Sequence, residues 1–279
     1  MFQARTIQIF LPDGNPRGLR LAEITSRTVQ VLLVPRAQLD EALKRSELEA
    51  VGVYFLVGES ADGVEPLVYV GEAEDVGTRL KQHQKQKEFW NFALVCISKT
   101  QYFTKSHVKF LEWYCHSQMK KVGRVTLENS TIPTKPFVSE SMEADLADNF
   151  DTMRILLGTL GFPFFDELTK GSSKTALVCK GKDAKALGEY SEEGLTVLAD
   201  STASATEAPS AGSWVVAMRA RLLEAKVLVP DGKVLRFAKT YLFPSPSAAA
   251  ATVLGRRANG WKESKYPDGR DLDNVFRQS

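Results

Sequence analysis

The sequence predicts an α+β protein with about two domains. Strand-like runs rich in β-branched and aromatic residues alternate with segments whose apolar residues recur at helical spacing. Clusters of Pro, Gly, Asn and Asp separate these runs. The 279 residues, 43% hydrophobic and 25% charged, suffice for about two ordinary globular cores. We therefore expect a small antiparallel β-sheet flanked by helices, with a β-rich N-terminal extension and a second, smaller α+β domain.

Composition argues against several classes of protein. No apolar run approaches the ~20 residues that span a bilayer, and the apolar stretch at residues 7–10 is shorter than the core of a secretory signal. We therefore expect a cytoplasmic protein without a membrane segment. The cysteines, Cys96, Cys115 and Cys179, lack Cys-x-x-Cys spacing, so we expect reduced core residues and no zinc site. The net charge of +2 does not decide for or against a nucleic-acid partner, and it leaves the oligomeric state open.

Residues 1–49 are predicted to form the β-rich extension. Turn sequences such as Pro12-Asp13-Gly14 separate strand-like runs, which is typical of antiparallel strands. A short helix is expected over residues 36–45, because Leu39 and Leu43 give it an apolar side. Nothing in this part is typical of a catalytic site, so we interpret it as an extension of the sheet. The expected strands are residues 6–11, 19–24 and 29–34.

Residues 51–57 and 67–71 predict a β-hairpin. Both runs are rich in β-branched and aromatic residues, and a polar stretch containing glycine separates them. A hairpin symmetric about that loop pairs Tyr54 with Tyr69 and Gly52 with Gly71. Directly opposed residues share one face of a sheet. The two phenols are therefore expected to stand side by side.

A short helix is predicted after the hairpin. Asp75 is a suitable N-cap, and Glu74 lies beside it where the helix dipole favours an acid. Arg79 and His83 are four residues apart, so they lie on one face of this helix. A guanidinium and an imidazole are therefore expected to converge with the phenols.

A buried strand and a longer helix are predicted next. Residues 91–98 form a continuous apolar run, which is typical of a central strand buried on both faces. Residues 104–121 predict a helix with Glu112 at the edge of its apolar stripe. A carboxylate in that position must be hydrated, paired or metal-bound. Two interpretations of Glu112 stand: a metal ligand, or an ion pair with Lys105 or Lys109. The stripe consists of Val108, Leu111, Cys115 and Met119.

Residues 99–124 are strongly basic, with Glu112 as their single acid. Aromatic residues are interleaved with the basic ones, a composition typical of surfaces that bind phosphates and stack on bases. A solvated lysine face is the alternative. We expect a nucleic-acid-binding ledge at Lys105, Lys109, Lys120, Lys121 and Arg124, with Lys99 as a further basic residue.

Several of these residues together resemble the signature of the GIY-YIG nuclease family. The resemblance covers residues 50–132 and places the nuclease-like domain at residues 50–135. The acidic residues 72–75 depart from what a phosphate-binding enzyme is expected to carry. The residues that match are Gly52-Val53-Tyr54, Tyr69-Val70-Gly71, Arg79, His83, Glu112 and Asn129.

The resemblance implies a metal-dependent endonuclease that hydrolyses phosphodiester bonds in DNA, with RNA as an alternative substrate. It implies that Glu112 holds Mg²⁺ or Mn²⁺ and that Arg79 holds the scissile phosphate. Tyr69 is the preferred general base and Tyr54 the positioning phenol, with support from His83. Asn129 would orient the substrate phosphate or a neighbouring side chain. Two other functions stand beside this one: a nucleic-acid-binding module without catalysis, and a protein-interaction scaffold.

Residues 136–172 are interpreted as a helical connector. An acidic helix is expected over residues 142–158, and the best candidate for a linker is residues 171–174, which contain Gly and Ser. The helix is expected to bury Leu146, Phe150, Met153 and Leu157.

Residues 173–279 are predicted to form the second α+β domain. This part resembles an uncharacterised domain that accompanies GIY-YIG modules, and the resemblance implies no activity of its own. We expect a loose segment at residues 201–212 and a helix at residues 213–225 with Trp214, Met218 and Leu222 on one side. A second helix should begin at Ser245-Pro246 and end at Gly255. Residues 256–262 offer a second basic and aromatic grip on DNA. Strands are expected at residues 176–179 and 195–198, and a hairpin at residues 227–237.

Overall fold

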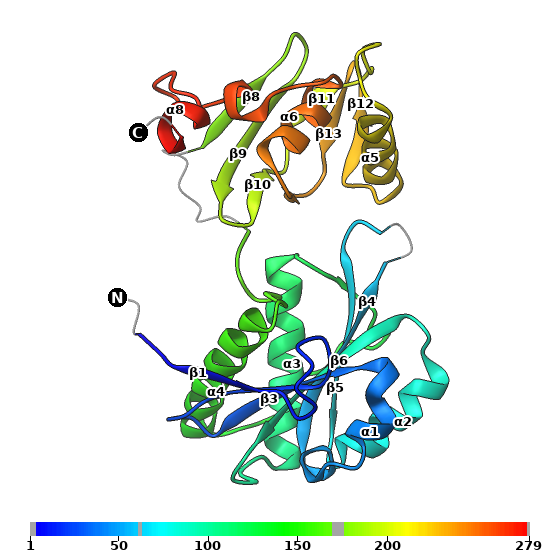
Figure 1. Ribbon diagram of the computed structural model, residues 1–279, viewed down its shortest axis with the longest axis vertical. Coiled ribbons are helices and arrows are strands. Elements are labelled where there is room, and N and C mark those ends of the chain that lie inside the picture. Colours follow the sequence, from blue (N-terminus) through cyan, green and yellow to red (C-terminus); the bar gives the residue numbers. More distant parts are fainter. Residues whose placement is uncertain (1–3, 61–62, 169–175, 278–279) are drawn as a thin grey trace. The chain divides into compact units, whose positions relative to one another are not determined.

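The computed structural model describes residues 4–60, 63–168 and 176–277. The chain forms two compact units, residues 1–166 and 167–279, each of which is α+β (Figure 1). The linker predicted at residues 171–174 lies outside the described residues. No helix in the described part of the chain is long and apolar enough to cross a membrane.

The first unit is built on a mixed β-sheet, which has seven strands within the described residues. Its pairings are antiparallel except between the last two strands, which run parallel. The N-terminal strands join this sheet through the β3–β6 pairing, so residues 1–49 extend the same sheet, as expected, and are not a separate unit. The strands in spatial order are β1 (Ile7–Phe10), β2 (Arg20–Ile24), β3 (Val29–Pro35), β6 (Trp90–Ser98), β4 (Gly52–Glu59), β5 (Pro66–Ala73) and β7 (Thr126–Leu127).

Helices cover both faces of this sheet (Figure 1). On one face, α1 (Leu39–Ala42) and α2 (Val76–Gln86), with the short 3₁₀ turns η1 (Arg36–Gln38) and η2 (Ser46–Glu49), enclose a core. On the other face, α3 (Lys105–Val122) and α4 (Glu140–Thr159) enclose a second core. The two cores follow the alternation of strand residues, because neighbouring side chains of a strand point to opposite faces.

Helix α4 is part of the first unit and not a connector. Its predicted apolar residues are buried in the core that α3 and the sheet also line, and the helix packs on β2 and β3. The acidic residues that suggested a connector lie on its outer side, as is usual for an amphipathic surface helix. These buried residues are Leu146, Phe150, Met153 and Leu157.

The hairpin β4–β5 forms with a register that differs from the symmetric prediction. Tyr54 lies opposite Gly71, and Tyr69 lies opposite Leu56. The shift is two residues along one strand, so both phenols keep the same face and become diagonal neighbours. Side-chain volume explains this register, because a Cβ on Gly71 would lie 2.3 Å from the Tyr54 hydroxyl oxygen. The Tyr54 ring occupies the space that only glycine leaves open.

The ends of α2 and α3 confirm the predicted helix limits within one or two residues. Asp75 caps α2, since its carboxylate accepts a hydrogen bond from the Thr78 backbone N–H at 2.8 Å. Thr104 begins α3, and Gly123 ends it in the left-handed conformation. The strand before α3, β6, is central and almost entirely buried, as its apolar sequence predicts.

The second unit contains two antiparallel sheets within the described residues, one of five strands and one of three. The five-stranded sheet has the order β14 (Tyr241–Phe243), β10 (Gly194–Val197), β9 (Lys185–Ser191), β8 (Leu177–Lys180) and β15 (Ser264–Lys265). The three-stranded sheet has the order β11 (Thr202–Ser204), β13 (Val234–Phe237) and β12 (Leu228–Asp231). The helices are α5 (Ser213–Glu224), α6 (Pro246–Leu254), α7 (Gly260–Glu263) and α8 (Leu272–Phe276).

Most predicted elements of the second unit are present. The caps of α6 are Ser245 and Gly255, as predicted. Two interpretations were wrong. The segment at residues 201–212 contains β11, which pairs with β13. Trp214 is 47% exposed, because α5 buries Val215 and Arg219 with Leu222 and so turns a different side inward.

Candidate functional site

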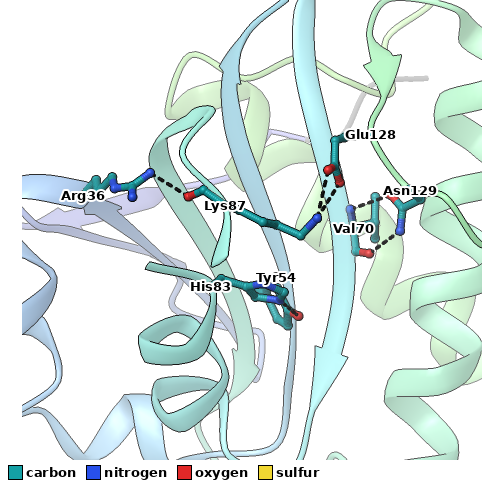
Figure 2. Close-up of polar contacts among 7 residues, drawn as sticks. All are labelled: Arg36, Tyr54, Val70, His83, Lys87, Glu128 and Asn129. Atoms are coloured by element: carbon teal, nitrogen blue, oxygen red, sulfur yellow. Dashed lines mark hydrogen bonds and ion pairs between the residues drawn. The ribbon is translucent and has the colours of Figure 1, made fainter. Parts of the chain in front are cut away.

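Two phenols and an imidazole meet on the α2 face of the sheet. The Tyr54 hydroxyl oxygen lies 2.8 Å from His83 Nε2 (Figure 2). The rings of Tyr54 and Tyr69 have their centroids 6.2 Å apart, and the Tyr69 ring lies edge-on to His83 at 5.2 Å. Strands β4 and β5 and helix α2 supply these three side chains. The predicted convergence of Tyr54, Tyr69 and His83 is therefore present in the structure.

The two phenols differ in their access to solvent. Tyr54 is 1% exposed, whereas Tyr69 is half-buried. Burial is the main cause that raises the pKa of Tyr54 well above its ordinary value, with a further contribution from the nearby Tyr69. The Tyr54 hydroxyl therefore stays protonated near neutral pH. Tyr69 is the phenol that a solvent-borne reactant can reach.

Arg79 joins this cluster from the preceding turn of α2. Its guanidinium is half-buried and donates a hydrogen bond to Gln82 Oε1 at 2.9 Å. Interaction with Tyr54 raises the pKa of Arg79, and Tyr69 contributes in the same direction. A guanidinium with donors left over beside two phenols is suited to hold an oxyanion such as a phosphate.

His83 is neutral near pH 7. Burial lowers its pKa to about 4, and the charges of Arg79 and Lys87 add to this effect. Its Nδ1 is buried and has no hydrogen-bond partner among the described residues. One hydrogen bond therefore joins the neutral ring to the Tyr54 hydroxyl, and it fixes the position of that phenol.

A cation that sequence reasoning missed lies over Tyr69. Lys87 Nζ is 4.6 Å from the centre of the Tyr69 ring, which is the geometry of a cation–π contact. The same ammonium contacts both carboxylate oxygens of Glu128, at 2.8 and 2.9 Å. Lys87 follows His83 by four residues, so the spacing of Arg79, His83 and Lys87 along one helix face is the signal that could have revealed it.

Asn129 contacts the backbone of β5 through both polar atoms of its side-chain amide. Its Oδ1 accepts from the Val70 N–H at 3.0 Å, and its Nδ2 donates to the Val70 carbonyl at 2.7 Å (Figure 2). These contacts give Asn129 a structural role, and the predicted role of orienting a phosphate or a side chain stays a prediction. Beyond β7 the edge of β5 has no strand partner among the described residues, and the Asn129 amide satisfies the Val70 backbone groups there. It fixes the strand next to Tyr69.

The N-terminal part also supports the site. Arg36 donates hydrogen bonds to the carbonyl oxygens of Gln84 and Lys87, each at 2.9 Å, at the end of α2. Figure 2 shows the contact with Lys87. Its guanidinium also lies 4.8 Å from the centre of the Trp90 ring. Carbonyl groups in the last turn of a helix need such donors, and a cation there is favoured by the helix dipole. Arg36 therefore holds the turn that carries Lys87.

Glu112 lies on α3 and belongs to the wider site through its charge environment. Its side chain is half-buried, and burial followed by the charge of Glu72 raises its pKa to about 7. Lys105, Lys109 and Arg79 act in the opposite direction. The alternative ion pair is not found, since no ion pair among the described residues includes Glu112 and Lys105 pairs with Glu72 at 2.9 Å. Glu112 is thus a carboxylate without a counterion near Arg79.

The predicted basic ledge is divided into two parts. Helix α3 has 18 residues and is roughly 27 Å long at 1.5 Å per residue, with Lys105 and Lys109 near its start and Lys120 and Lys121 in its last turn. Arg124 donates to the Pro163 carbonyl at 3.3 Å and so serves the fold. The five predicted residues are therefore spread over the length of α3 and the residues just after it, and their binding of nucleic acid stays a prediction. Of the five residues of the predicted ledge, only Lys105 and Lys109 lie close enough to affect the charge of Glu112.

The donors near Glu112 fit a hard cation held by few protein ligands. Among the described residues, no group of three or more His, Cys, Asp or Glu side chains could enclose a metal ion. Magnesium needs no such cage, because it commonly uses one or two carboxylates and completes its shell with water and substrate phosphate. Glu112 meets this requirement, with Glu72 as the neighbouring carboxylate.

Comparison with known families gives one match, in the second unit. Residues 177–276 match the model of a domain of unknown function (DUF4357). This agrees with the predicted separate C-terminal domain. The match lies outside residues 50–132, so the resemblance of that part to GIY-YIG nucleases stays a prediction. No curated protein and no solved structure matches the chain.

Proposed function

We propose that the chain is a metal-dependent endonuclease that hydrolyses phosphodiester bonds, with DNA as the expected substrate. The observation that carries this proposal is the convergence of Tyr54, Tyr69, Arg79 and His83. The carboxylate of Glu112, which forms no ion pair among the described residues, lies within electrostatic reach of Arg79. Phosphodiester hydrolysis needs an oriented water, compensation of developing negative charge and help for the leaving oxygen.

Each side chain has a task that suits its environment. Arg79 holds the scissile phosphate, because its guanidinium keeps donors for two oxygens. Tyr69 is the more accessible phenol, so it contacts the attacking water. It either orients this water or, as general base, accepts its proton. Tyr54 is buried and bonded to His83, so it positions Tyr69 and the phosphate rather than exchanging protons.

Glu112 would hold the divalent cation, Mg²⁺ or Mn²⁺, which when bound stabilises negative charge on phosphate oxygens and lowers the pKa of water. Glu112 must be ionised to do so. Its raised pKa of about 7 means that protons compete with the metal below that pH.

Removing the hydroxyl of each phenol tests the different roles proposed for Tyr69 and Tyr54. We expect Tyr69→Phe to lower the cleavage rate by ~10²-fold or more and Tyr54→Phe to lower it less. Phenyl keeps nearly the same volume, so packing is preserved and the hydroxyl is isolated. Single-turnover rates at saturating DNA measure the effect. Rates equal to wild type in both variants would exclude a catalytic phenol.

Lys87→Met tests the cation over Tyr69. Methionine keeps a flexible side chain of similar length without the charge, so Tyr69 loses the cation–π contact and Glu128 loses its counterion. We expect a ~10-fold slower reaction. Single-turnover rates at saturating DNA measure the effect, and thermal melting shows whether the variant is folded. A rate equal to wild type in the folded variant would remove Lys87 from the site.

A second candidate function is nucleic-acid binding without cleavage. The observation that favours it is the pairing of Glu72 with Lys105, which leaves Glu112 as the sole unpaired carboxylate there within the described residues. A panel of single- and double-stranded DNA and RNA, incubated with Mg²⁺, Mn²⁺ or a chelator, separates the two. Cleavage in metal that stops in chelator supports the nuclease. Retained binding with no cleavage in either metal supports the binding module.

A further inference from the structure

The five-stranded sheet of the second unit has one covered and one open face. Strands β8 and β9 alternate buried and accessible residues, and the buried set, including Cys179 and Ala186, lies beneath α6. Residues of the other set lie on the opposite face, which we call the outer face. Strand β15 continues the same alternation, with Ser264 buried opposite Cys179 and Lys265 exposed opposite Val178.

Lysines dominate the outer face where β8, β9 and β15 meet. Lys180 and Lys185 are direct cross-strand partners, and both are exposed. Lys265 lies on the adjacent strand, and Lys182 lies in the turn between β8 and β9. Like charges placed directly opposite each other destabilise a strand pair. The Lys180–Lys185 pair therefore does not stabilise the sheet, which indicates that its charges serve another purpose.

These lysines have no counterions within the part of the chain that the structure describes. None of Lys180, Lys182, Lys185 and Lys265 takes part in an ion pair there. The nearest acids in sequence are Asp183 in the same turn and Glu189 farther along β9, and Glu189 has an interaction of its own. The outer face therefore carries an excess of positive charge at this end.

In the basic segment predicted from sequence as a second grip, residues 256–262, three side chains are engaged within the unit, whereas Arg257 is exposed. Arg256 pairs with Glu263 at 2.7 Å, and Lys262 pairs with Asp273 at 2.8 Å. The Trp261 ring is covered by the Arg277 guanidinium at 3.7 Å. These side chains stabilise the end of the chain and offer no open stacking platform. The lysines of the outer face, in contrast, are exposed and take part in no ion pair within the described residues.

We propose that the outer face of this sheet, at Lys180, Lys182, Lys185 and Lys265, binds the phosphodiester backbone of nucleic acid. Charge complementarity identifies this partner, because a row of ammonium groups on adjacent strands suits a polyanion. The accessible neighbours on the face are aliphatic, Val178 and the 39% exposed Leu187, and not aromatic. The face therefore contacts phosphates and does not read bases. This role is separate from the chemistry proposed for the first unit.

Binding of labelled DNA by the full chain tests this role. The variant Lys180→Gln/Lys185→Gln/Lys265→Gln removes three charges, and the matched control Arg221→Gln/Lys226→Gln/Lys233→Gln removes three from exposed positions elsewhere in the same unit. Fluorescence anisotropy with a 20-base-pair duplex and a 20-nucleotide single strand, in chelator, gives affinity between 50 and 200 mM NaCl. We expect at least tenfold weaker binding for the first variant and a salt slope smaller by about 2 to 3. The control should stay within about twofold.

Chelator prevents cleavage, so the result does not depend on the nuclease proposal. Thermal melting establishes that the variant is folded, and the Lys→Arg triple variant should restore affinity. Unchanged affinity and salt slope in the folded glutamine variant would overturn the proposal. Two further binding experiments replace the DNA, one with vesicles that contain phosphatidylserine and the other with poly-glutamate. Lysine-dependent binding to either one, with DNA affinity unaffected, would assign the face to a membrane or an acidic protein and also overturn it.

Discussion

Replacing Glu112 with glutamine should lower metal-dependent cleavage by ~10²-fold or more while the protein stays folded. The amide keeps the size of the side chain but cannot supply the anionic oxygen that a hard cation requires. Glu112 is the half-buried carboxylate without an ion-pair partner near Arg79, so no other described side chain takes over its role directly. Initial rates across a Mg²⁺ titration measure the loss.

The stability of the same variant provides the control. The pKa of Glu112 is raised from 4.5 to about 7, so the folded state favours its protonated form. The stability that this group contributes is therefore complete below about pH 4.5 and is lost as the pH rises towards 7. Glutamine never ionises. In chelator, Glu112→Gln should be more stable than wild type above pH 7, by roughly 1 kcal/mol after solvent screening, and equal to it near pH 4.5.

Two outcomes would contradict this account of Glu112. Undiminished cleavage by the folded variant would remove it from the metal site. A variant that is less stable than wild type above pH 7 would show that the carboxylate is a structural ion-pair partner in solution.

Replacing Arg79 with lysine should lower the cleavage rate by ~10²-fold with little change in stability. Lysine keeps the positive charge and loses the planar fork that holds two phosphate oxygens. The guanidinium also interacts with Tyr54, so the variant removes one partner of that buried hydroxyl, which keeps its contact with His83. Single-turnover rates at saturating DNA separate this effect from weaker binding.

Lys81→Arg on the same helix is the matched control for Arg79→Lys. Lys81 is exposed and forms no described ion pair, so exchange of one cation for the other should leave the rate within about twofold. Equal rates in Arg79→Lys and wild type would mean that Arg79 supplies charge and no directed contact.

The strands and helices that carry the site could be predicted because their signals are local. Runs of β-branched and aromatic residues identified β4 and β5, the helical spacing of apolar residues identified α3, and the capping residue Asp75 identified the start of α2. The register of the hairpin could not be obtained in this way. It depends on the contact between the Tyr54 ring and Gly71 across two strands, which a symmetric loop does not reveal.

Roles that depend on distant partners were also beyond local reasoning. Asn129 serves the backbone of Val70, a residue 59 positions earlier, because β7 is too short to pair with all of β5. Lys87 meets Glu128 across 41 positions. The predicted ledge grouped basic residues because they are close in sequence. The length of α3 separates Lys105 and Lys109 at its start from Lys120 and Lys121 in its last turn.

The central claim is that this site cleaves phosphodiester bonds, and the most direct measurement is cleavage of end-labelled DNA by the purified full chain. Wild type should produce cut DNA in Mg²⁺ or Mn²⁺ and none in chelator. The Arg79→Lys/Glu112→Gln variant, purified in the same way, should produce none in either condition although it melts as a folded protein. Equal cleavage by wild type and this variant would assign the activity to a contaminant, and no cleavage by wild type across the DNA and RNA panel would contradict the proposed nuclease.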